Sequence, residues 1–189
     1  MRFDEVLCRS DGSAIAEELA ALRTPGRFVL DGVHQVSARE HRQFRLDIDD
    51  VRQAWTLDRQ RMPTISFRDG VLHSEDSDFE DTFEHSTAAG GVVRMALPDR
   101  LVCWGRGPES FSPVLVQHVG VHSILVTFEH QHDPAFRTTL VVDERDGIAR
   151  RRMDGAEVTI VTQVRPVSPD ETLPRARFTP LTDWIRPSC

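Results

Sequence analysis

Five Asp-Gly pairs divide this chain of 189 residues and constrain its fold more than any other feature. They are Asp11-Gly12, Asp31-Gly32, Asp69-Gly70, Asp146-Gly147 and Asp154-Gly155. Glycine has no Cβ, so an Asp-Gly pair readily takes the positive φ angles of a type I′ hairpin turn. The last four pairs lie in or beside runs in which apolar and polar residues alternate, which is the period of a half-buried strand. The pattern predicts an antiparallel β protein built of hairpins.

One segment has a helical period instead of a strand period. Residues 13–23 carry a single apolar stripe, made of Ile15, Leu19 and Leu22, and Asp11 or Ser13 can cap the helix. The predicted sheet covers residues 27–165, with strand segments at 28–36, 43–48, 51–57, 65–67, 71–73, 114–121, 123–129, 138–142, 148–153 and 157–164. Asp31-Gly32 falls inside the first of these segments and predicts either a bulge or a hairpin there.

Three other segments do not have the pattern of a strand. Residues 74–91 carry six acidic side chains and a small-residue run, which predicts a solvated acidic loop with one helical turn at most. A calcium site would need the ligand spacing of an EF-hand, and this loop lacks it. A short apolar stretch follows at 92–104, and residues 166–189 form a proline-rich tail.

The predicted fold class is mainly β, with a strongly curved antiparallel sheet or an incomplete β-barrel and the N-terminal helix packed on it. The length suits a single domain over residues 1–189. A curved sheet has a concave side, and this side is a natural place for an apolar ligand. Trp55, Phe67, Trp104 and Phe111 either belong to the core or line such a ligand cavity.

Composition excludes several classes of function. The net charge is −7 with no basic block, so nucleic acid is not an expected partner, and no apolar run is long enough for a transmembrane helix. The chain has no Lys, Asn or Tyr, whose codons are AT-rich, which indicates a GC-rich bacterium and excludes lysine Schiff-base chemistry. Three widely spaced cysteines predict free thiols, and the first eight residues, MRFDEVLC, lack the apolar region of a signal peptide. We therefore expect a cytoplasmic protein.

Histidines supply the one candidate metal site. His118 and His122 are four residues apart in a segment with strand character, and His130 and His132 repeat the arrangement at a spacing of two. Imidazoles that meet in space can bind zinc or iron. The alternative is that these are polar-face or turn histidines that bind nothing. No nucleophile elbow and no phosphate-binding loop accompanies them, so neither a cofactor nor an enzyme is expected.

The C-terminal third resembles the LolA/RseB-like lipoprotein carriers. The sequence LVVDERDG at 140–147, an Arg-containing strand, the Asp154-Gly155 hairpin and a final strand to Val164 are similar to the order of motifs in that family. The acidic-proline exit at 168–174, Phe178 and the mid-chain proline segment at 96–101 are similar as well. The resemblance implies an unclosed β-barrel whose concave face holds acyl chains or another apolar ligand.

Three functional hypotheses follow from these observations. The first is a non-enzymatic carrier-like protein that binds a lipid or acyl chain on the concave face of the sheet, gated by the 74–91 loop or the N-terminal helix. The second is a metal-dependent or acid-base enzyme that uses the four histidines. The third is an interaction module that acts through an edge strand and forms a homodimer.

Overall fold

A computed structural model of the chain describes residues 1–24, 26–37, 40–82, 91–98 and 111–178. Its helical elements are η1 (Arg9–Asp11), α1 (Gly12–Leu22) and α3 (Gly91–Ala96). Its strands are β1 (Glu5–Val6), β2 (Arg27–Gln35), β3 (His41–Asp49), β4 (Ala54–Arg59), β5 (Ile65–Arg68), β6 (Val71–Ser74), β7 (Ser77–Thr82), β8 (Phe111–His118), β9 (Ser123–His130), β10 (Arg137–Asp143), β11 (Ala149–Asp154) and β12 (Glu157–Val167).

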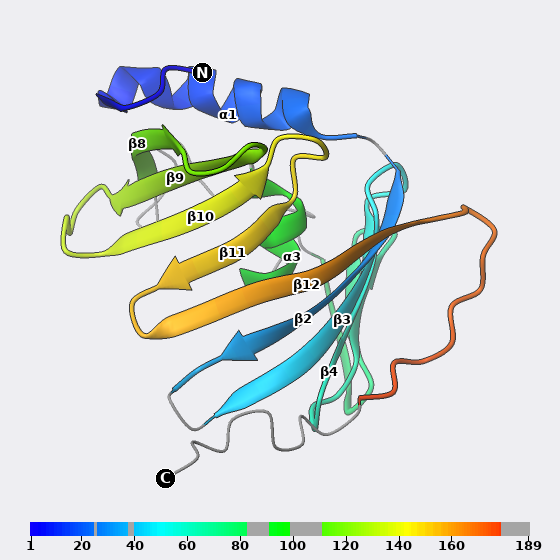
Figure 1. Ribbon diagram of the computed structural model, residues 1–189. Helices are drawn as coiled ribbons and strands as arrows, with labels where there is room; N and C mark the ends of the chain where they lie inside the picture. Colours follow the sequence, from blue (N-terminus) through cyan, green and yellow to red (C-terminus); the bar gives the residue numbers. More distant parts are fainter. Residues whose placement is uncertain (25, 38–39, 83–90, 99–110, 179–189) are drawn as a thin grey trace, which may run out of the picture.

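All these strands belong to one antiparallel sheet in the order β1-β8-β9-β10-β11-β12-β2-β3-β4-β5-β6-β7 (Figure 1). The sheet does not close, because β1 and β7 end it without pairing with each other. Most neighbours in the sheet are also neighbours in sequence, as hairpins require. The exceptions are β12 with β2 and β1 with β8. The predicted fold class, a mainly β chain with a curved, unclosed sheet and an N-terminal helix, is confirmed.

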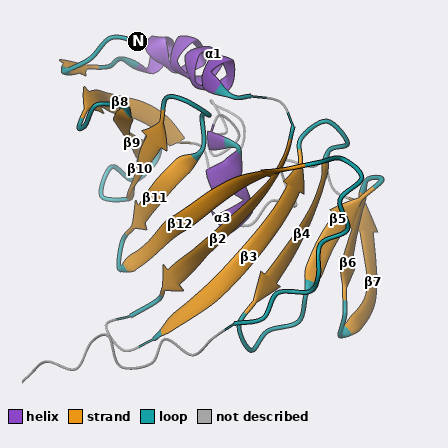
Figure 2. Cartoon of the chain, turned by 45° about the vertical axis from the view of Figure 1, so that its right-hand side comes forward, coloured by secondary structure: helices purple, strands orange, loops and turns teal. Residues whose placement is uncertain are grey.

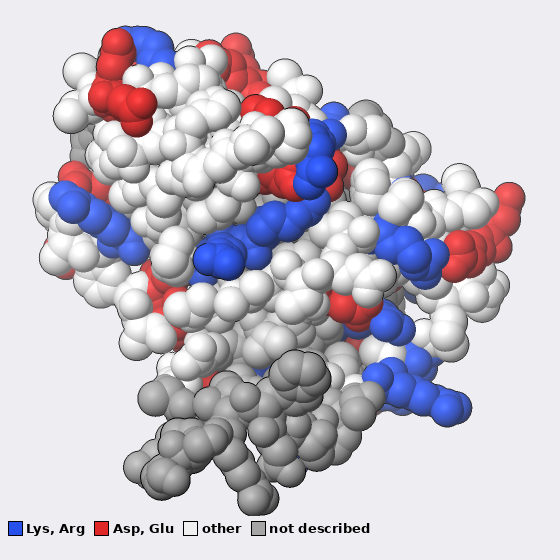
Figure 3. Space-filling view, viewed as in Figure 1, with Lys and Arg blue, Asp and Glu red and all other residues white. Residues whose placement is uncertain are grey.

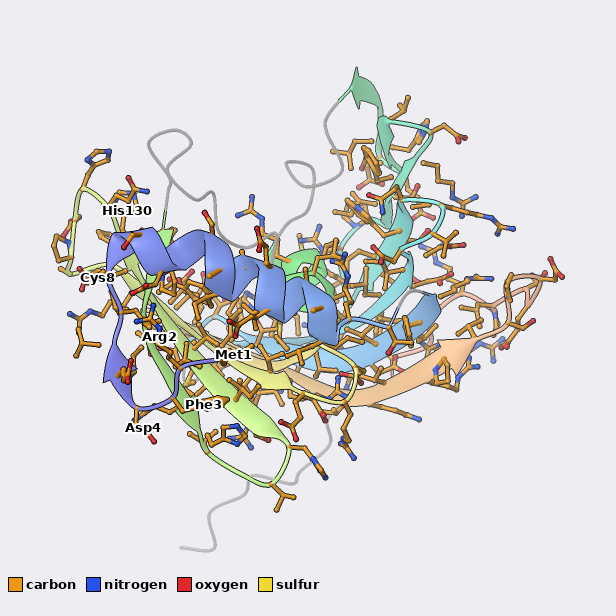
Figure 4. The ribbon with its side chains drawn as sticks, turned by 90° about the horizontal axis from the view of Figure 1, so that it is seen from above. Met1, Arg2, Phe3, Asp4, Cys8 and His130 are labelled. Carbon is orange, nitrogen blue, oxygen red and sulfur yellow. The ribbon has the colours of Figure 1, made fainter. Side chains whose placement is uncertain are left out.

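The sheet bends around α3, and α1 lies over the strands β8 to β10 (Figures 1 and 4). We call the face toward α3 the inner face. It carries Leu30, Leu46 and Leu57, which are paired side by side on β2, β3 and β4 and are completely or almost completely buried. The opposite face, which carries Asp31, Arg45 and other polar residues, is the outer face. Strand alternation therefore separates an apolar inner face from a charged outer face.

Two Asp-Gly hairpins form as their sequence predicts. Asp69 and Gly70 both have positive φ angles, 52° and 81°, as a type I′ turn requires, and they join β5 to β6. Gly155 has a φ of 56° in the turn between β11 and β12. The Asp11-Gly12 pair instead begins α1, with Asp11 at the N-cap. The Asp11 carboxylate accepts a hydrogen bond from the Cys8 backbone N–H at 2.7 Å and makes no capping bond to the helix.

The Asp31-Gly32 pair lies within the continuous strand β2, so its hairpin alternative is wrong. The irregularity lies in the facing strand, where the β12 register shifts between Val161 and Gln163 opposite Gly32. A Cβ at position 32 would overlap the Ile160 carbonyl oxygen and the Phe44 ring. Glycine is needed here because the backbone of β12 approaches β2 so closely.

The structure corrects the prediction of an acidic loop at 74–91. Residues 77–82 form β7, which pairs with β6 through backbone hydrogen bonds that do not depend on side-chain polarity. The remaining residues of that prediction, 83–90, lie outside the described residues. In the apolar stretch 92–104, residues up to 96 belong to α3, and residues 99–104 also lie outside the described part. Val51 is 72% exposed in the turn between β3 and β4 and does not continue a strand.

A buried carboxylate closes the turn between β10 and β11. Asp143 is 6% exposed and accepts hydrogen bonds from Arg145 Nη2 at 2.6 Å and from the Arg145 backbone N–H at 3.1 Å. The side-chain bond from Arg145 is the main reason that the pKa of Asp143 falls from 3.8 to about 2, and Arg150 contributes a smaller electrostatic effect. The ionised carboxylate therefore stabilises the folded chain.

We expect Gly32→Ala to lower the free energy of unfolding by about 3 kcal/mol, because the new methyl group overlaps a backbone carbonyl that cannot move independently. Urea unfolding followed by circular dichroism measures the change. Gly120→Ala is the matched control, since a Cβ there meets Ser123 at an ordinary distance of 3.4 Å. Equal effects of the two substitutions would contradict the close approach of β12 to β2.

Asp143→Asn should lower the free energy of unfolding by roughly 2 kcal/mol at pH 7, because the folded state favours the ionised form. The carboxylate has a lower pKa in the folded chain than in the unfolded one. Its contribution is thus full above pH 4 and is lost as the pH falls toward 2. Stability measured from pH 7 to pH 2 should show the wild type and the variant converging at the acid end. A constant difference across this range would exclude the electrostatic explanation.

Candidate functional site

The inner face of β4 and β5 carries a stacked aromatic pair. Trp55 and Phe67 face each other across the two strands, each 2% exposed, with ring centroids 6.1 Å apart and planes inclined by 16°. The Trp55 indole Nε1 is buried and has no hydrogen-bond partner among the described residues. A buried indole N–H normally finds an acceptor, so this position can receive a polar atom of a ligand.

α3 occupies the middle of the inner face. Its Val93 and Met95 side chains are fully buried, and the helix spans from β11 to β3. At its C-terminal end, Ala96 and Leu97 lie beside Phe28 and Ile48 and leave a gap of only about 10 Å³. In the part of the chain that the structure describes, the middle of the inner face is therefore filled by this six-residue helix.

The structure brings together two of the four aromatic residues that the sequence singled out. Trp55 and Phe67 stack, whereas Phe111 is half-buried at the start of β8, with six strands between it and β4. Phe111 instead contacts the His130 ring, with centroids 5.2 Å apart. Trp104 lies outside the described residues.

The four histidines do not converge. His118 contacts the Phe3 ring at 3.9 Å, and His122 lies 2.9 Å from the Glu144 carboxylate. His130 and His132 lie 5.9 Å apart at the other end of the β8–β9 hairpin, roughly 23 Å along the strand from the first pair. Figure 4 shows Phe3 and His130 well separated. No group of three or more His, Cys, Asp or Glu side chains that could hold a metal is found among the described residues.

A row of basic side chains crosses the inner face at the end of these strands far from α1. Cross-strand pairing aligns Arg152 of β11 with Thr159 of β12, then with His34 of β2 and Arg42 of β3. Arg59 of β4 pairs with Phe44, one inward-facing position along β3 from Arg42. We call His34, Arg42, Arg59 and Arg152 the cationic row. Sequence analysis missed it, although Arg42 has the same strand parity as Phe44 and Leu46.

Burial and neighbouring positive charges lower two pKa values in the cationic row. The pKa of His34 is lowered, first by burial and then by the positive charges of Arg152, Arg42 and Arg59, with Glu157 acting in the opposite direction. The pKa of Arg59 is lowered by burial and by Arg42. His34 is therefore neutral at pH 7, and its Nδ1 lies 2.9 Å from the Thr159 hydroxyl.

The outer face carries a polar cavity of about 660 Å³ beneath residues 168–176, which we call the strap. Arg27 holds one end of the strap: its Nη1 donates to the carbonyl oxygens of Ser168, Pro169 and Glu171 at 3.5, 3.3 and 2.7 Å. The strap's other end is held by Asp58, which accepts from the Ala176 N–H at 3.3 Å. Figure 3 shows a continuous strip of basic side chains across the middle of the visible face, with acidic side chains beside it and elsewhere on the surface.

The cavity is lined by ion pairs that satisfy one another. Arg27 pairs with Asp47 at 2.6 Å, Arg45 with Asp31 at 2.8 Å, and the strap's Arg175 with Glu75 at 2.7 Å. Three of the arginines that line this cavity are thus paired with carboxylates. Its polarity does not suit an acyl chain, and Figure 2 shows the strap passing over β3 and β4 on the side away from α3.

No protein-family model matches the chain, and none of the curated proteins matches it. Among solved structures, the chain is similar to the crystal structure of MucB, with a TM-score of 0.48 and 12% identity over 84% of this chain and 60% of that one. A MucA/MucB complex from Pseudomonas aeruginosa gives a TM-score of 0.47 and 13% identity over 82% and 56%. A LolA superfamily protein from Nitrosomonas europaea gives 0.41 and 9% over 86% and 94%.

The chain thus spans about 60% of the length of the MucB structure that it matches. The LolA/RseB-like resemblance seen in the sequence is confirmed at the level of the fold alone. It carries no ligand or partner over to this chain. No described helix is long and apolar enough to span a membrane.

Arg27→Gln should release the strap, because the variant loses the guanidinium that donates to three strap carbonyls. Trypsin should then cut the chain after Arg175 about tenfold faster than in the wild type, because local opening governs cleavage at such sites. Arg45→Gln removes a comparable ion pair from the same face without touching the strap and serves as the control. Equal cleavage rates in the two variants would show that Arg27 does not hold the strap.

Proposed function

We propose that this chain is a non-enzymatic, carrier-like binding protein that accepts a hydrophobic ligand, a lipid or acyl chain, on the inner face where α3 now lies. The observation that supports this most is the arrangement of α3. Among the described residues, one short helix covers the middle of an apolar surface that extends from Phe128 on β9 to Phe67 on β5. A ligand that displaces the helix side chains gains access to Leu46, Trp55 and Phe67.

The free energy that α3 gains by packing on the inner face is small enough for an acyl chain to replace it there. Val93, Met95 and Leu97 are the large apolar side chains that α3 and its next residue bury, and they contribute roughly 6 kcal/mol together. A 12-carbon chain that enters the same surface gains about 0.8 kcal/mol per methylene, or roughly 10 kcal/mol. Chains of about eight carbons or more should therefore compete with α3, and shorter chains should not.

We expect Met95→Ala to raise the affinity for a neutral 12-carbon amphiphile about tenfold, because α3 then competes less well for the inner face. The measurement is displacement of the neutral fluorescent probe N-phenyl-1-naphthylamine by dodecyl maltoside below its micelle concentration. Hexyl maltoside, with a chain too short to compete with α3, should not displace the probe.

Leu19→Ala is the matched control for this experiment. Leu19 is 1% exposed in α1, so its truncation costs about as much stability as that of Met95, about 3 kcal/mol, without touching α3. The proposal predicts tighter binding in Met95→Ala only. Failure of the wild type to bind probe or amphiphile would contradict it, as would equal changes in both variants.

A second candidate function is an interaction module that uses a sheet edge. The order of the strands leaves β7 at one end of the sheet, and the backbone groups of an edge strand can pair with another chain. The homodimer that this would produce stays a prediction, which size-exclusion chromatography at several concentrations can test. The cytoplasmic location also stays a prediction.

A further inference from the structure

We propose that the cationic row is a binding site for the anionic group of the ligand, so that the ligand class is an amphiphile with an apolar chain and a phosphate or carboxylate head. This inference rests on the proposed function, because it assigns the head of a ligand whose chain lies on the inner face. It follows from the position of the row, from Arg59, which has no acidic partner among the described residues, and from the row's buried unpaired nitrogens.

The position of the row continues the apolar surface. Leu30, Leu46 and Leu57 lie in register on β2, β3 and β4. On the same face of β2 and β3, in the direction away from α1, the next cross-strand pair is Gly32 with Phe44, and the pair after it is His34 with Arg42. Neighbouring inward positions on one strand are about 6.6 Å apart, so Arg59 lies roughly 7 Å from Leu57, and His34 and Arg42 lie roughly 13 Å from Leu30 and Leu46. An extended chain of about ten carbons spans the longer distance.

The acidic neighbours of the row do not pair with all of its arginines. Glu40 pairs with Arg42, and Asp154 pairs with Arg152, while Glu157 lies 3.8 Å from the His34 ring, which is neutral at pH 7. Arg59 has no acidic partner among the described residues, and no acidic group raises its pKa. A half-buried guanidinium without a counter-charge attracts an anion strongly because its own hydration is incomplete.

The row also has hydrogen-bond donors that the described part of the chain leaves unused. The Nε atoms of Arg59 and Arg152 are both buried and without a hydrogen-bond partner there. Arg152 lies against Gly91, where a Cβ would overlap its guanidinium, so the row meets the first residue of α3. Displacement of α3 by a ligand therefore opens the apolar surface and the cationic row together. Two forked guanidinium groups suit the oxygens of a phosphate or carboxylate.

The test compares three compounds in the same probe-displacement assay: dodecyl phosphate, dodecyl maltoside and inorganic phosphate. The wild type should bind dodecyl phosphate at least about tenfold more tightly than dodecyl maltoside. Arg59→Gln should remove most of this preference and leave the affinity for dodecyl maltoside unchanged. Arg59→Lys should retain part of it, because the charge remains while the fork is lost.

Arg68→Gln is the matched control, because it removes the same charge at an exposed position on β5 outside the row. Thermal unfolding of each variant verifies folding, and Arg59→Gln should be at least as stable as the wild type, since an unpaired, partly buried charge is lost. The inference would be overturned if the wild type bound dodecyl phosphate no more tightly than dodecyl maltoside, or if its preference for dodecyl phosphate survived Arg59→Gln. In either case, binding of dodecyl maltoside would leave the proposed function standing.

The remaining outcomes distinguish an anionic headgroup of an amphiphile from a free anion. Inorganic phosphate should bind far more weakly than dodecyl phosphate, because it lacks the chain. Calorimetry measures the binding of inorganic phosphate. If inorganic phosphate bound as tightly as dodecyl phosphate, and if Arg59→Gln abolished that binding, the headgroup assignment would be overturned in favour of a free-anion site. Binding of neither amphiphile would overturn the proposed function and this inference together.

Discussion

The ladder between β12 and β2 is the interaction on which the rest of the structure depends. It pairs residues from Val158↔Gln35 to Val167↔Arg27, and so joins the strands near the start of the chain to those near its end. Without it, the sheet would separate into a β2–β7 half and a β8–β12 half, each with an open edge. The two halves form one continuous inner face only because the Gly32 backbone lets β12 approach at the bulge.

The continuous inner face has a polarity gradient that neither half has alone. Its apolar part is built by leucines of β2, β3 and β4 and by the Trp55–Phe67 stack. Its polar end combines Arg152 from one half with His34, Arg42 and Arg59 from the other. A surface that changes from apolar to cationic over roughly 7 to 13 Å matches the length scale of an amphiphile. The outer face, with its ion pairs and other charged groups beneath the strap, lacks this gradient.

Local chemistry allowed much of the fold to be predicted. Asp69-Gly70 and Asp154-Gly155 specify their turns through backbone φ alone, and the stripe of Ile15 and Leu19 identifies α1. The sequence did not predict β7, because its acidic side chains do not indicate the backbone pairing with β6. The complete cationic row could not be predicted, since Arg152 joins His34, Arg42 and Arg59 only through the β12–β2 register. The two histidine pairs lie at opposite ends of the β8–β9 hairpin, whose own register separates them.

The central claim is that an amphiphile replaces α3 on the inner face, and methyl NMR of the four methionines tests it most directly. Met95 is fully buried in α3, whereas Met153 is 37% exposed on β11 and reports on the opposite face of the sheet. During titration with dodecyl phosphate, we predict that the Met95 methyl resonance shifts and narrows as α3 leaves the sheet, while Met153 is unchanged. A saturating titration that leaves the Met95 resonance in place would contradict the account.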